Sequence, residues 1–182
     1  MKSITFNTGE FKVEKTSAWL VAFIKFAQTL GALDLLDQIK VKMKEIDYTV
    51  HQKMMTLLLS VVIGCRYTSD INQKLVPDTV AANLLDMKRF PDQSQVNELL
   101  RRIDSNGVEQ LKNVHHQMFV QNAQCLSTKD TVVVDIDQSG LIANGKTYEL
   151  AQKGYFSKKK NQKGYQLSAA FCGNENSETI SM

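Results

Sequence analysis

The sequence has few of the residues that mark secreted, fibrous or low-complexity proteins. Its 182 residues include two prolines and nine glycines, which excludes collagen-like and low-complexity chains. The three cysteines, Cys65, Cys125 and Cys172, are scattered and form no CxxC pair, so they indicate neither a disulfide framework nor a zinc site. We expect them to be reduced, small, buried side chains of a cytoplasmic protein.

Long hydrophobic segments are also missing. The longest apolar-rich run, 54–65 (MMTLLLSVVIGC), has 12 residues, whereas a membrane-spanning helix needs about 20. Residues 1–16 lack the apolar centre of a secretory signal. The hydrophobic content of 43% is ordinary for a globular protein, and the length suits one domain or a small domain plus part of a second. These features predict a cytoplasmic protein without a membrane partner.

The excess of positive charge is confined to one short segment. The whole chain has a net charge of +3, but residues 146–165 (KTYELAQKGYFSKKKNQKGY) hold six lysines against Glu149 alone. A compact positive segment with aromatic neighbours attracts a phosphate backbone. On charge alone, a solvated lysine-rich turn is the simpler interpretation. The candidate DNA contacts in this segment are Lys158, Lys159, Lys160 and Lys163.

The first two thirds of the chain follow helical periodicity. In 17–31 (SAWLVAFIKFAQTLG), six apolar residues recur at a spacing that predicts one apolar helix face, with Ser17 as N-cap and Gly31 as C-terminal stop. Residues 50–65 are apolar nearly all round and, capped by Thr49, should form the buried centre of a bundle. Further helices are predicted at 32–39, from Ser69, from Thr79, and after a turn at Ser105-Asn106-Gly107.

These elements predict a helical domain over residues 1–128 with its own core. Within it, the segment 90–104 (FPDQSQVNELLRRID) suits a DNA-reading helix that begins after Phe90-Pro91, capped by Asp92 or Ser94. Arg101 and Arg102 would then reach phosphates. The alternative is an ordinary bundle helix with a polar outer face. The polar side chains near its start, which could meet base edges, are Gln93, Ser94, Gln95 and Asn97.

The pattern changes at Thr128. Residues 130–137 (DTVVVDID) predict a buried strand covered on both faces, ending at Asp137 before a turn at 138–140. Because side chains two apart in a strand share a face, Asp135 and Asp137 should project together near its end. Two buried carboxylates repel, and a Mg²⁺ ion between or beside them removes the conflict. Loop-amide bonds to Asp135 and a turn cap by Asp137 are the alternative.

The remaining residues predict more strands. Asn144-Gly145 is a hairpin signal, 164–173 (GYQLSAAFCG) reads as a second buried strand, and 178–182 reads as the opening of a third. The predicted fold class is therefore α+β: a helical bundle over 1–128, followed by an incomplete second domain over 129–182.

The motifs VVVDIDQSG and GKTYELAQKGYFSKKKNQKGYQLSAAFCG resemble the start of the catalytic domain of DDE transposases from bacterial insertion sequences. The segments AWLVAFIKFAQTLGALDLL and RFPDQSQVNELLRRI resemble parts of the helical DNA-binding domain of the same family. The resemblance covers roughly residues 17–182 and is most specific over 130–173. It implies that the second domain is the first part of a ribonuclease-H-like α/β domain.

The resemblance implies roles for the two acids. Asp137 matches the first catalytic carboxylate of the family, a Mg²⁺ ligand in a two-metal site that acts on a DNA phosphodiester. Asp135 matches a supporting acidic position. The implied partner is the DNA of transposon ends, with a homodimer or pairing with a full-length transposase as a further expectation. The second Asp and the Glu of the family are not matched before Met182, so we expect a truncated transposase that does not cut or join DNA by itself.

Two other interpretations stay open. The pattern of four apolar residues followed by DxD also matches phosphatases of the haloacid dehalogenase type, in which Asp135 would be the nucleophile and Asp137 the acid/base. The match after DxD is imperfect at Gln138-Ser139-Gly140, and the basic aromatic segment has no role in such an enzyme. A non-enzymatic helical DNA-binding regulator needs only residues 17–126 and the basic segment.

Overall fold

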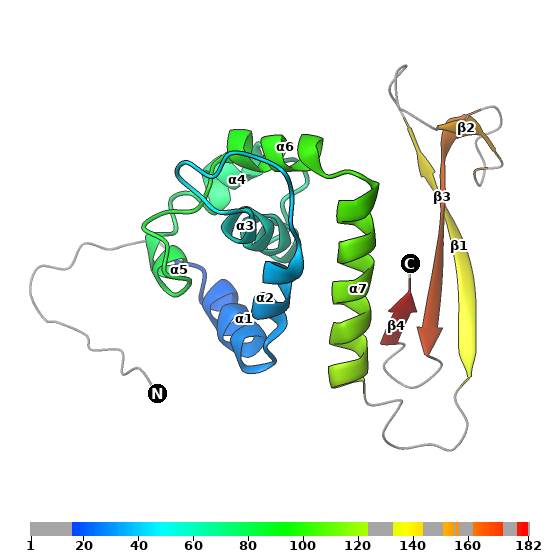
Figure 1. Cartoon of the computed structure of the whole chain (residues 1–182), viewed down its shortest axis with the longest axis horizontal. Coiled ribbons are helices and arrows are strands. Elements are labelled where there is room, and N and C mark those ends of the chain that lie inside the picture. The colour runs from blue at the N-terminus through cyan, green and yellow to red at the C-terminus, as the bar shows by residue number, and fades with distance from the viewer. Residues whose placement is uncertain are drawn as a thin grey trace, which may run out of the picture. The chain divides into compact units, whose positions relative to one another are not determined.

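The computed structural model describes residues 16–123, 133–143, 151–154, 156, 162–172 and 178–181 (Figure 1). Helices occupy the N-terminal part and a single antiparallel sheet the C-terminal part, as expected for an α+β protein. The chain divides into two compact units, Met1–Val108 and Glu109–Met182. Most of the last helix therefore belongs to the second unit, although the sequence analysis placed it in the helical domain.

The first unit is built from short helices. Two of the described helices have 12 and 13 residues, and every other helix contributes ten residues or fewer to this unit. In chain order the elements are α1 (Ala18–Thr29), α2 (Ala32–Leu35), the 3-10 helix η1 (Leu36–Gln38), α3 (Val50–Val62), α4 (Asp70–Lys74), α5 (Thr79–Asn83), α6 (Gln93–Arg102) and the first residues of α7 (Ser105–Asn122).

Helix α1 begins and ends where the sequence predicted. The Ser17 side chain accepts a hydrogen bond from the Leu20 amide, and Gly31 adopts a left-handed φ of 67° directly after the helix. The predicted apolar side chains share one face of this helix, but only part of the face is buried: Leu20 is fully buried, whereas the neighbouring Trp19 is 65% exposed. Among the described elements, α2 and α5 pack against α1, and several of its other apolar side chains stay at the surface of this part of the chain.

Helix α3 is the main buried helix of the unit. Thr49 and Gln52 form the full capping box, with the Gln52 amide donating to Thr49 Oγ1 and the Thr49 amide donating to Gln52 Oε1. The helix contacts η1 and α6, and Leu59 is fully buried. Burial is not complete all round, since Val61 is 68% exposed.

Asp78 links the starts of two helices. Its carboxylate accepts from Thr16 Oγ1 at 3.2 Å and the Ser17 amide at 3.0 Å, and from the Ala81 amide at 2.9 Å. Asp78 is 3% exposed, and these three donors compensate for the burial of its charge. Thr79 begins α5 as predicted, but Asp78 is the residue that caps the helix.

The turn predicted at Ser105-Asn106-Gly107 is wrong. These three residues form the first turn of α7, because Asp104 Oδ1 accepts the Gly107 amide at 2.9 Å and satisfies a donor at the start of the helix. The Ser-Asn-Gly sequence is typical of turns, but the preceding aspartate makes it a helix start.

The second unit contains an antiparallel sheet with β3 at its centre. Strand β1 pairs along one edge of β3, and β2 and β4 also pair with β3. The strands predicted at 164–173 and from 178 are found as β3 and β4, but the predicted burial of the first of them is wrong, because most of β3 is exposed. The bounds are β1 (Val134–Ile142), β2 (Gln152–Lys153), β3 (Lys163–Cys172) and β4 (Glu178–Ser181).

The predicted burial and end of the first strand are both wrong. Strand β1 is exposed from Val134 to Leu141, because within the described part of the chain it pairs with β3 alone and only Phe156 packs against it, at Gly140. It does not end at Asp137 but continues to Ile142, and Gln138 Nε2 donates to the cross-strand Ser168 Oγ at 3.2 Å instead of entering a turn. The antiparallel ladder with β3 thus extends through the expected turn.

Phe156 forms a small core on one face of this sheet. It is 4% exposed and lies against three glycines, Gly140 of β1, Gly154 after β2, and Gly164 of β3. Because of the strand register, Gly140 and Gly164 share a face, and Asp135 and Asp137 project from the opposite one. The glycines allow the ring to contact the sheet backbone directly.

Among the residues described, no single helix is both long and apolar enough to cross a bilayer. Only α1 and the segment 32–38, which meet at 75°, reach that length and composition as a pair. The predicted Asn144-Gly145 hairpin lies outside the described residues.

Candidate nucleic-acid interface

The start of α6 is fixed by Asp92, as predicted. Its Oδ1 accepts from the Ser94 hydroxyl at 2.6 Å and from the amides of Ser94 and Gln95 at 2.9 and 3.2 Å. The hydrogen bond from the Ser94 hydroxyl is the largest cause that lowers the pKa of Asp92; burial, the next largest, opposes it, and the amides of Gln95 and Ser94 and the charge of Arg89 lower the pKa further. The carboxylate therefore stays charged at the helix N-terminus, where the dipole favours it.

The four polar side chains proposed to meet base edges are mostly unavailable. Gln93, Gln95 and Asn97 are half-buried, and the exposed Ser94 donates its hydroxyl to Asp92. The buried side of α6 carries Val96 and Leu99, both fully buried. This is the packing of an ordinary bundle helix with a polar outer side, which the sequence analysis kept as the alternative.

Exposed cations lie at both ends of α6. Arg101 and Arg102 occupy its last turn and are exposed, and Lys88 and Arg89 are exposed just before Phe90-Pro91. The described part of the chain shows no salt bridge to any of the four. Phe90 is fully buried and anchors the segment that carries the first pair. Arg101 and Arg102 are thus held by α6 itself, a helix about 15 Å long, and Lys88 and Arg89 by the segment that Phe90 anchors.

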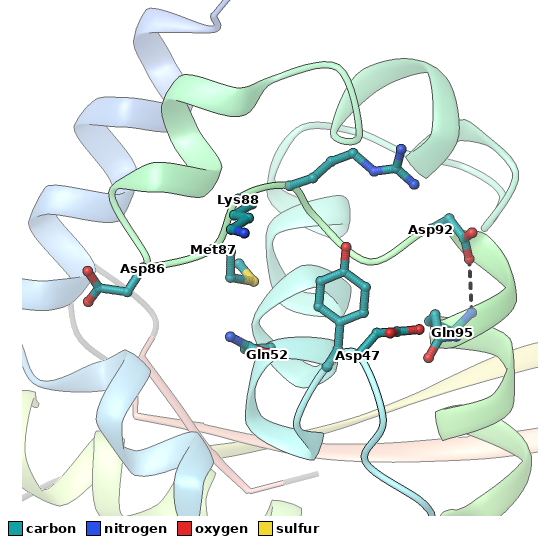
Figure 2. A pocket seen from close by; sticks show the side chains of 9 residues that line it. Asp47, Gln52, Asp86, Met87, Lys88, Asp92 and Gln95 are labelled. Atoms are coloured by element: carbon teal, nitrogen blue, oxygen red, sulfur yellow. Dashed lines mark hydrogen bonds between the residues drawn. The ribbon is translucent and has the colours of Figure 1, made fainter.

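A hollow of about 510 Å³ opens beside the N-terminal half of α6 (Figure 2). In Figure 2, Asp92 is joined to Gln95 by a hydrogen bond and Asp86 lies well apart from both. The sequence analysis missed this hollow, because its walls come from three separate segments with no shared motif. The lining residues are Asp47, Tyr48, Gln52, Asp86, Met87, Lys88, Arg89, Asp92 and Gln95.

The hollow combines both signs of charge. Over all the residues described, no group of three or more His, Cys, Asp or Glu side chains could hold a metal ion. Lys88 and Arg89 line it from the segment before α6. The hollow therefore adds polar surface next to Lys88 and Arg89.

Asp135 and Asp137 lie on one face of β1, as predicted. Their cross-strand partners are Phe171 and Ala169 of β3, and successive side chains on one face are about 7 Å apart. Both acids are exposed, and Asp137 Oδ1 accepts the Gln138 amide at 2.8 Å. Water screens the repulsion of exposed carboxylates. The prediction that these acids are buried and require a cation for that reason is therefore wrong, whereas the prediction that they share a face is confirmed.

The basic segment is only partly described. Lys163 is exposed at the first position of β3, opposite Lys153 of β2, and its carbonyl accepts the Ala143 amide at 2.9 Å. Lys163 lies six residues from Ala169 along β3, a distance of about 20 Å, and Ala169 is the cross-strand partner of Asp137. Lys158, Lys159 and Lys160 lie outside the described residues.

No family model, curated protein or solved structure matches this chain. The resemblance to DDE transposases therefore depends on the motifs quoted above.

Proposed function

We propose that this chain binds duplex DNA through the helical unit, and that it is a transposase-type protein in which Asp137 is the first Mg²⁺ ligand of a DDE site. The observation that carries the proposal is the pair of exposed basic dipeptides, Lys88-Arg89 and Arg101-Arg102, at the two ends of α6. The motif resemblance supplies the transposase class and the ribonuclease-H-like assignment of the sheet.

The spacing of these cations suits a phosphate backbone. A helix of ten residues is about 15 Å long, and phosphates along one strand of B-DNA rise by about 3.4 Å each, so α6 itself, whose last turn carries Arg101-Arg102, is as long as about four phosphate steps. Such contacts fix the position of the protein without reading sequence. This matches α6, whose polar side chains are mostly half-buried or committed to its cap.

The acid pair supports the metal part of the proposal. Mg²⁺ is commonly held by one or two carboxylates together with substrate phosphates and water. Asp135 and Asp137 offer two carboxylates on one exposed face, to which a DNA phosphate has free access. Lys163, about 20 Å along the sheet, would contact a phosphate about six nucleotides away on the same strand.

The test of DNA binding is the salt dependence of affinity. Binding of the full chain to a fluorescent duplex is measured by anisotropy between low and moderate salt, for the wild type and for Arg101→Ala/Arg102→Ala. Each lost phosphate contact lowers the slope of log K against log salt by about 0.9, so the double variant should lose roughly 2. The matched control, Lys42→Ala/Lys44→Ala, removes the same charge from two exposed positions before α3 and should retain the wild-type slope.

Absence of binding at low salt, or an equal loss in both double variants, would contradict the role of α6.

The metal is tested separately with Mn²⁺ and electron paramagnetic resonance in the presence of duplex DNA. Asp137→Asn should reduce bound Mn²⁺, and the control Glu45→Gln, at an exposed loop position, should not. Equal Mn²⁺ binding by all three proteins would remove Asp137 as a ligand while leaving DNA binding intact.

A further inference from the structure

The hollow beside α6 is bordered by three helix ends. Its volume of about 510 Å³ lies within the range of about 300–1,000 Å³ that is usual for small-molecule sites. Residues from the start of α3, from the segment after α5 and from the start of α6 line it (Figure 2). Each of these helix ends is fixed by its own hydrogen bonds, so the walls do not have to be ordered when a ligand binds.

The segment after α5 leaves the helix in a fixed direction. Asp86 has a left-handed φ of 57°, and its amide donates to the Asn83 carbonyl at 3.2 Å. The Met87 amide donates to the Ala82 carbonyl at 3.1 Å, which completes a Schellman motif. The motif satisfies carbonyls at the end of α5 and determines where the next residues of the chain lie.

Lys88 and Arg89 follow this motif and are anchored on both sides. Met87 before them and Phe90 after them are buried, whereas the two basic side chains are exposed. The described residues offer neither cation a salt bridge. This wall of the hollow therefore presents two uncompensated positive charges from an anchored backbone.

The other two walls present polar groups that have no protein partner. Gln52 Oε1 accepts the Thr49 amide at 3.0 Å, which leaves the NH₂ group of Gln52 free to donate. Tyr48 and Gln95 are half-buried, and neither side chain makes a hydrogen bond within the described part of the chain. The same is true there of the exposed Asp47 carboxylate. Because partly buried polar groups usually have partners, this set of free donors and acceptors favours a polar ligand.

Three aspartates and two cations line the hollow, but not all of these charges are available to a ligand. Asp92 Oδ1 already accepts three hydrogen bonds at the start of α6, where the helix dipole balances its charge. Asp86 lies well apart from Asp92 in Figure 2. The remaining charges are the Asp47 carboxylate and the cations of Lys88 and Arg89, and Figure 2 shows Asp47 apart from Lys88.

We propose that the hollow binds a nucleoside monophosphate whose base carries an exocyclic amino group. The phosphate binds Lys88 and Arg89, because charge-assisted hydrogen bonds to phosphate are strong and a guanidinium matches its geometry. The amino group donates to Asp47, in the way that carboxylates accept from N4 of cytosine. Tyr48 supplies a ring on which the base stacks, and the two carboxamides of the walls bind the remaining polar atoms of the base.

Mixed charge distinguishes this ligand from a simple cation, which the two uncompensated positive charges would repel. The site goes beyond the proposed contacts to duplex DNA, in which the bases stay paired. It does not depend on them, although Lys88 and Arg89 serve both. A free nucleotide and an unpaired nucleotide at the end of a DNA strand present the same chemistry, so the experiment has to separate these two sources.

The experiment is isothermal titration calorimetry of the full chain, without DNA, with deoxycytidine monophosphate (dCMP) and deoxyuridine monophosphate (dUMP). The two differ only in the amino group of the base, which dUMP replaces by a carbonyl. We expect dCMP to bind with a Kd on the order of 10–100 μM. Binding of dUMP, and of deoxycytidine without a phosphate, should each be weaker by about tenfold or more.

Two variants assign the contacts. Asp47→Asn should bind dCMP and dUMP alike, because the acceptor for the amino group loses its charge. Arg89→Gln should weaken dCMP by about tenfold and keep the preference for dCMP over dUMP. The matched controls are Glu45→Gln, in the same loop as Asp47, and Arg102→Gln, at the far end of α6. Both should bind dCMP as the wild type does, and circular dichroism should show that all variants fold.

The source of the nucleotide follows from a duplex with one unpaired dC at each 5′ end, compared with the blunt duplex. Tighter binding of the overhang by the wild type and not by Asp47→Asn identifies the strand end, whereas dCMP binding without an overhang effect identifies the free nucleotide. Neither effect, equal affinity of the wild type for dCMP and dUMP, or binding of L-arginine amide in place of dCMP would overturn the proposal. Weaker duplex binding by Arg102→Gln with unchanged dCMP binding separates the two sites, so either can fail alone.

Discussion

The contact between Phe156 and its glycines allows a sharp prediction for the second unit. A Cβ atom added at Gly140 would lie 2.5 Å from Phe156 Cδ1, a distance that real Cβ contacts essentially never show, and 3.2 Å from Cε1, which is tighter than most real contacts. The ring cannot move away freely, because its Cζ lies 2.8 Å from the position a Cβ would take on Gly164. Gly140→Ala should therefore overpack this small core.

The three glycines should differ in the cost of substitution. Overpacking costs about 1–3 kcal/mol, and the reduced freedom of the unfolded chain returns about 0.4–1 kcal/mol for Gly to Ala. Gly140→Ala should thus destabilise the sheet by about 1–2 kcal/mol. Gly164→Ala should cost more, because its Cβ would also collide with the backbone carbonyl of Leu141. At Gly154 the nearest ring atoms are 3.4 Å away, so Gly154→Ala should be close to neutral.

The assay is native-state amide hydrogen exchange read by mass spectrometry. Peptides covering 163–172 report on the sheet, and peptides covering 18–29 report on the helical unit. A loss of 1.4 kcal/mol corresponds to about tenfold faster exchange, so Gly140→Ala should accelerate exchange in β3 by about tenfold. The helical peptides, which belong to the other unit, should be unchanged.

Two outcomes would refute this reasoning. If Gly140→Ala and Gly154→Ala exchange alike, the ring is not confined between the glycines. Phe156→Leu in the Gly140→Ala background should recover part of the loss, because the smaller side chain leaves room for the new methyl group, and a purely additive double variant would also contradict the proposed contact.

Three further predictions concern the helical unit, whose unfolding is followed by the fluorescence of Trp19, the single tryptophan. Asp78→Ala removes an acceptor from three donors, one of them the Ala81 amide in a buried hydrogen bond, and should lower the free energy of unfolding by about 2–3 kcal/mol. The pKa of Asp92 is lowered in the folded state, so its contribution to the free energy of unfolding is fully present above its unfolded pKa of about 4 and is lost as the pH falls through the lower folded value. Asp92→Asn should therefore make the free energy of unfolding, measured by urea titration, less dependent on pH in this acid range. Gly64 has a φ of 74° with no atom within 4 Å of an added Cβ, so Gly64→Ala should cost about 1 kcal/mol from backbone conformation alone, seen as a lower melting temperature.

The helix starts could be predicted because their causes are local. Ser17, the Thr49–Gln52 box and Asp92 each satisfy amides within three residues, so a short sequence window contains the whole interaction. The start of α7 at Ser105 was not predicted, because Ser105-Asn106-Gly107 has the composition of a turn. The residue that decides for a helix, Asp104, stands just before this segment.

Burial could not be predicted in the same way, because it depends on partners elsewhere in the chain. The valines before Asp135 indicate a strand correctly, but not which strand lies beside it, and β3 rather than β1 is central. The α1 periodicity likewise gives the positions of apolar residues and not which of them are covered. The Phe156 core joins glycines at 140, 154 and 164, which no local pattern connects.

In the proposed function, the exposure of the acid pair determines how a metal would bind. Two solvated carboxylates about 7 Å apart, one of them accepting the Gln138 amide, provide too few ligands for a tight Mg²⁺ site, so phosphate oxygens must complete it. Metal and DNA binding are then coupled, and linkage requires that each raise the affinity of the other by the same factor. We expect Mn²⁺ to tighten duplex binding by the wild type and not by Asp137→Asn, with anisotropy titrations at fixed ionic strength as the measurement. An equal effect of Mn²⁺ on both proteins would show that the ion acts on DNA alone and that Asp137 takes no part.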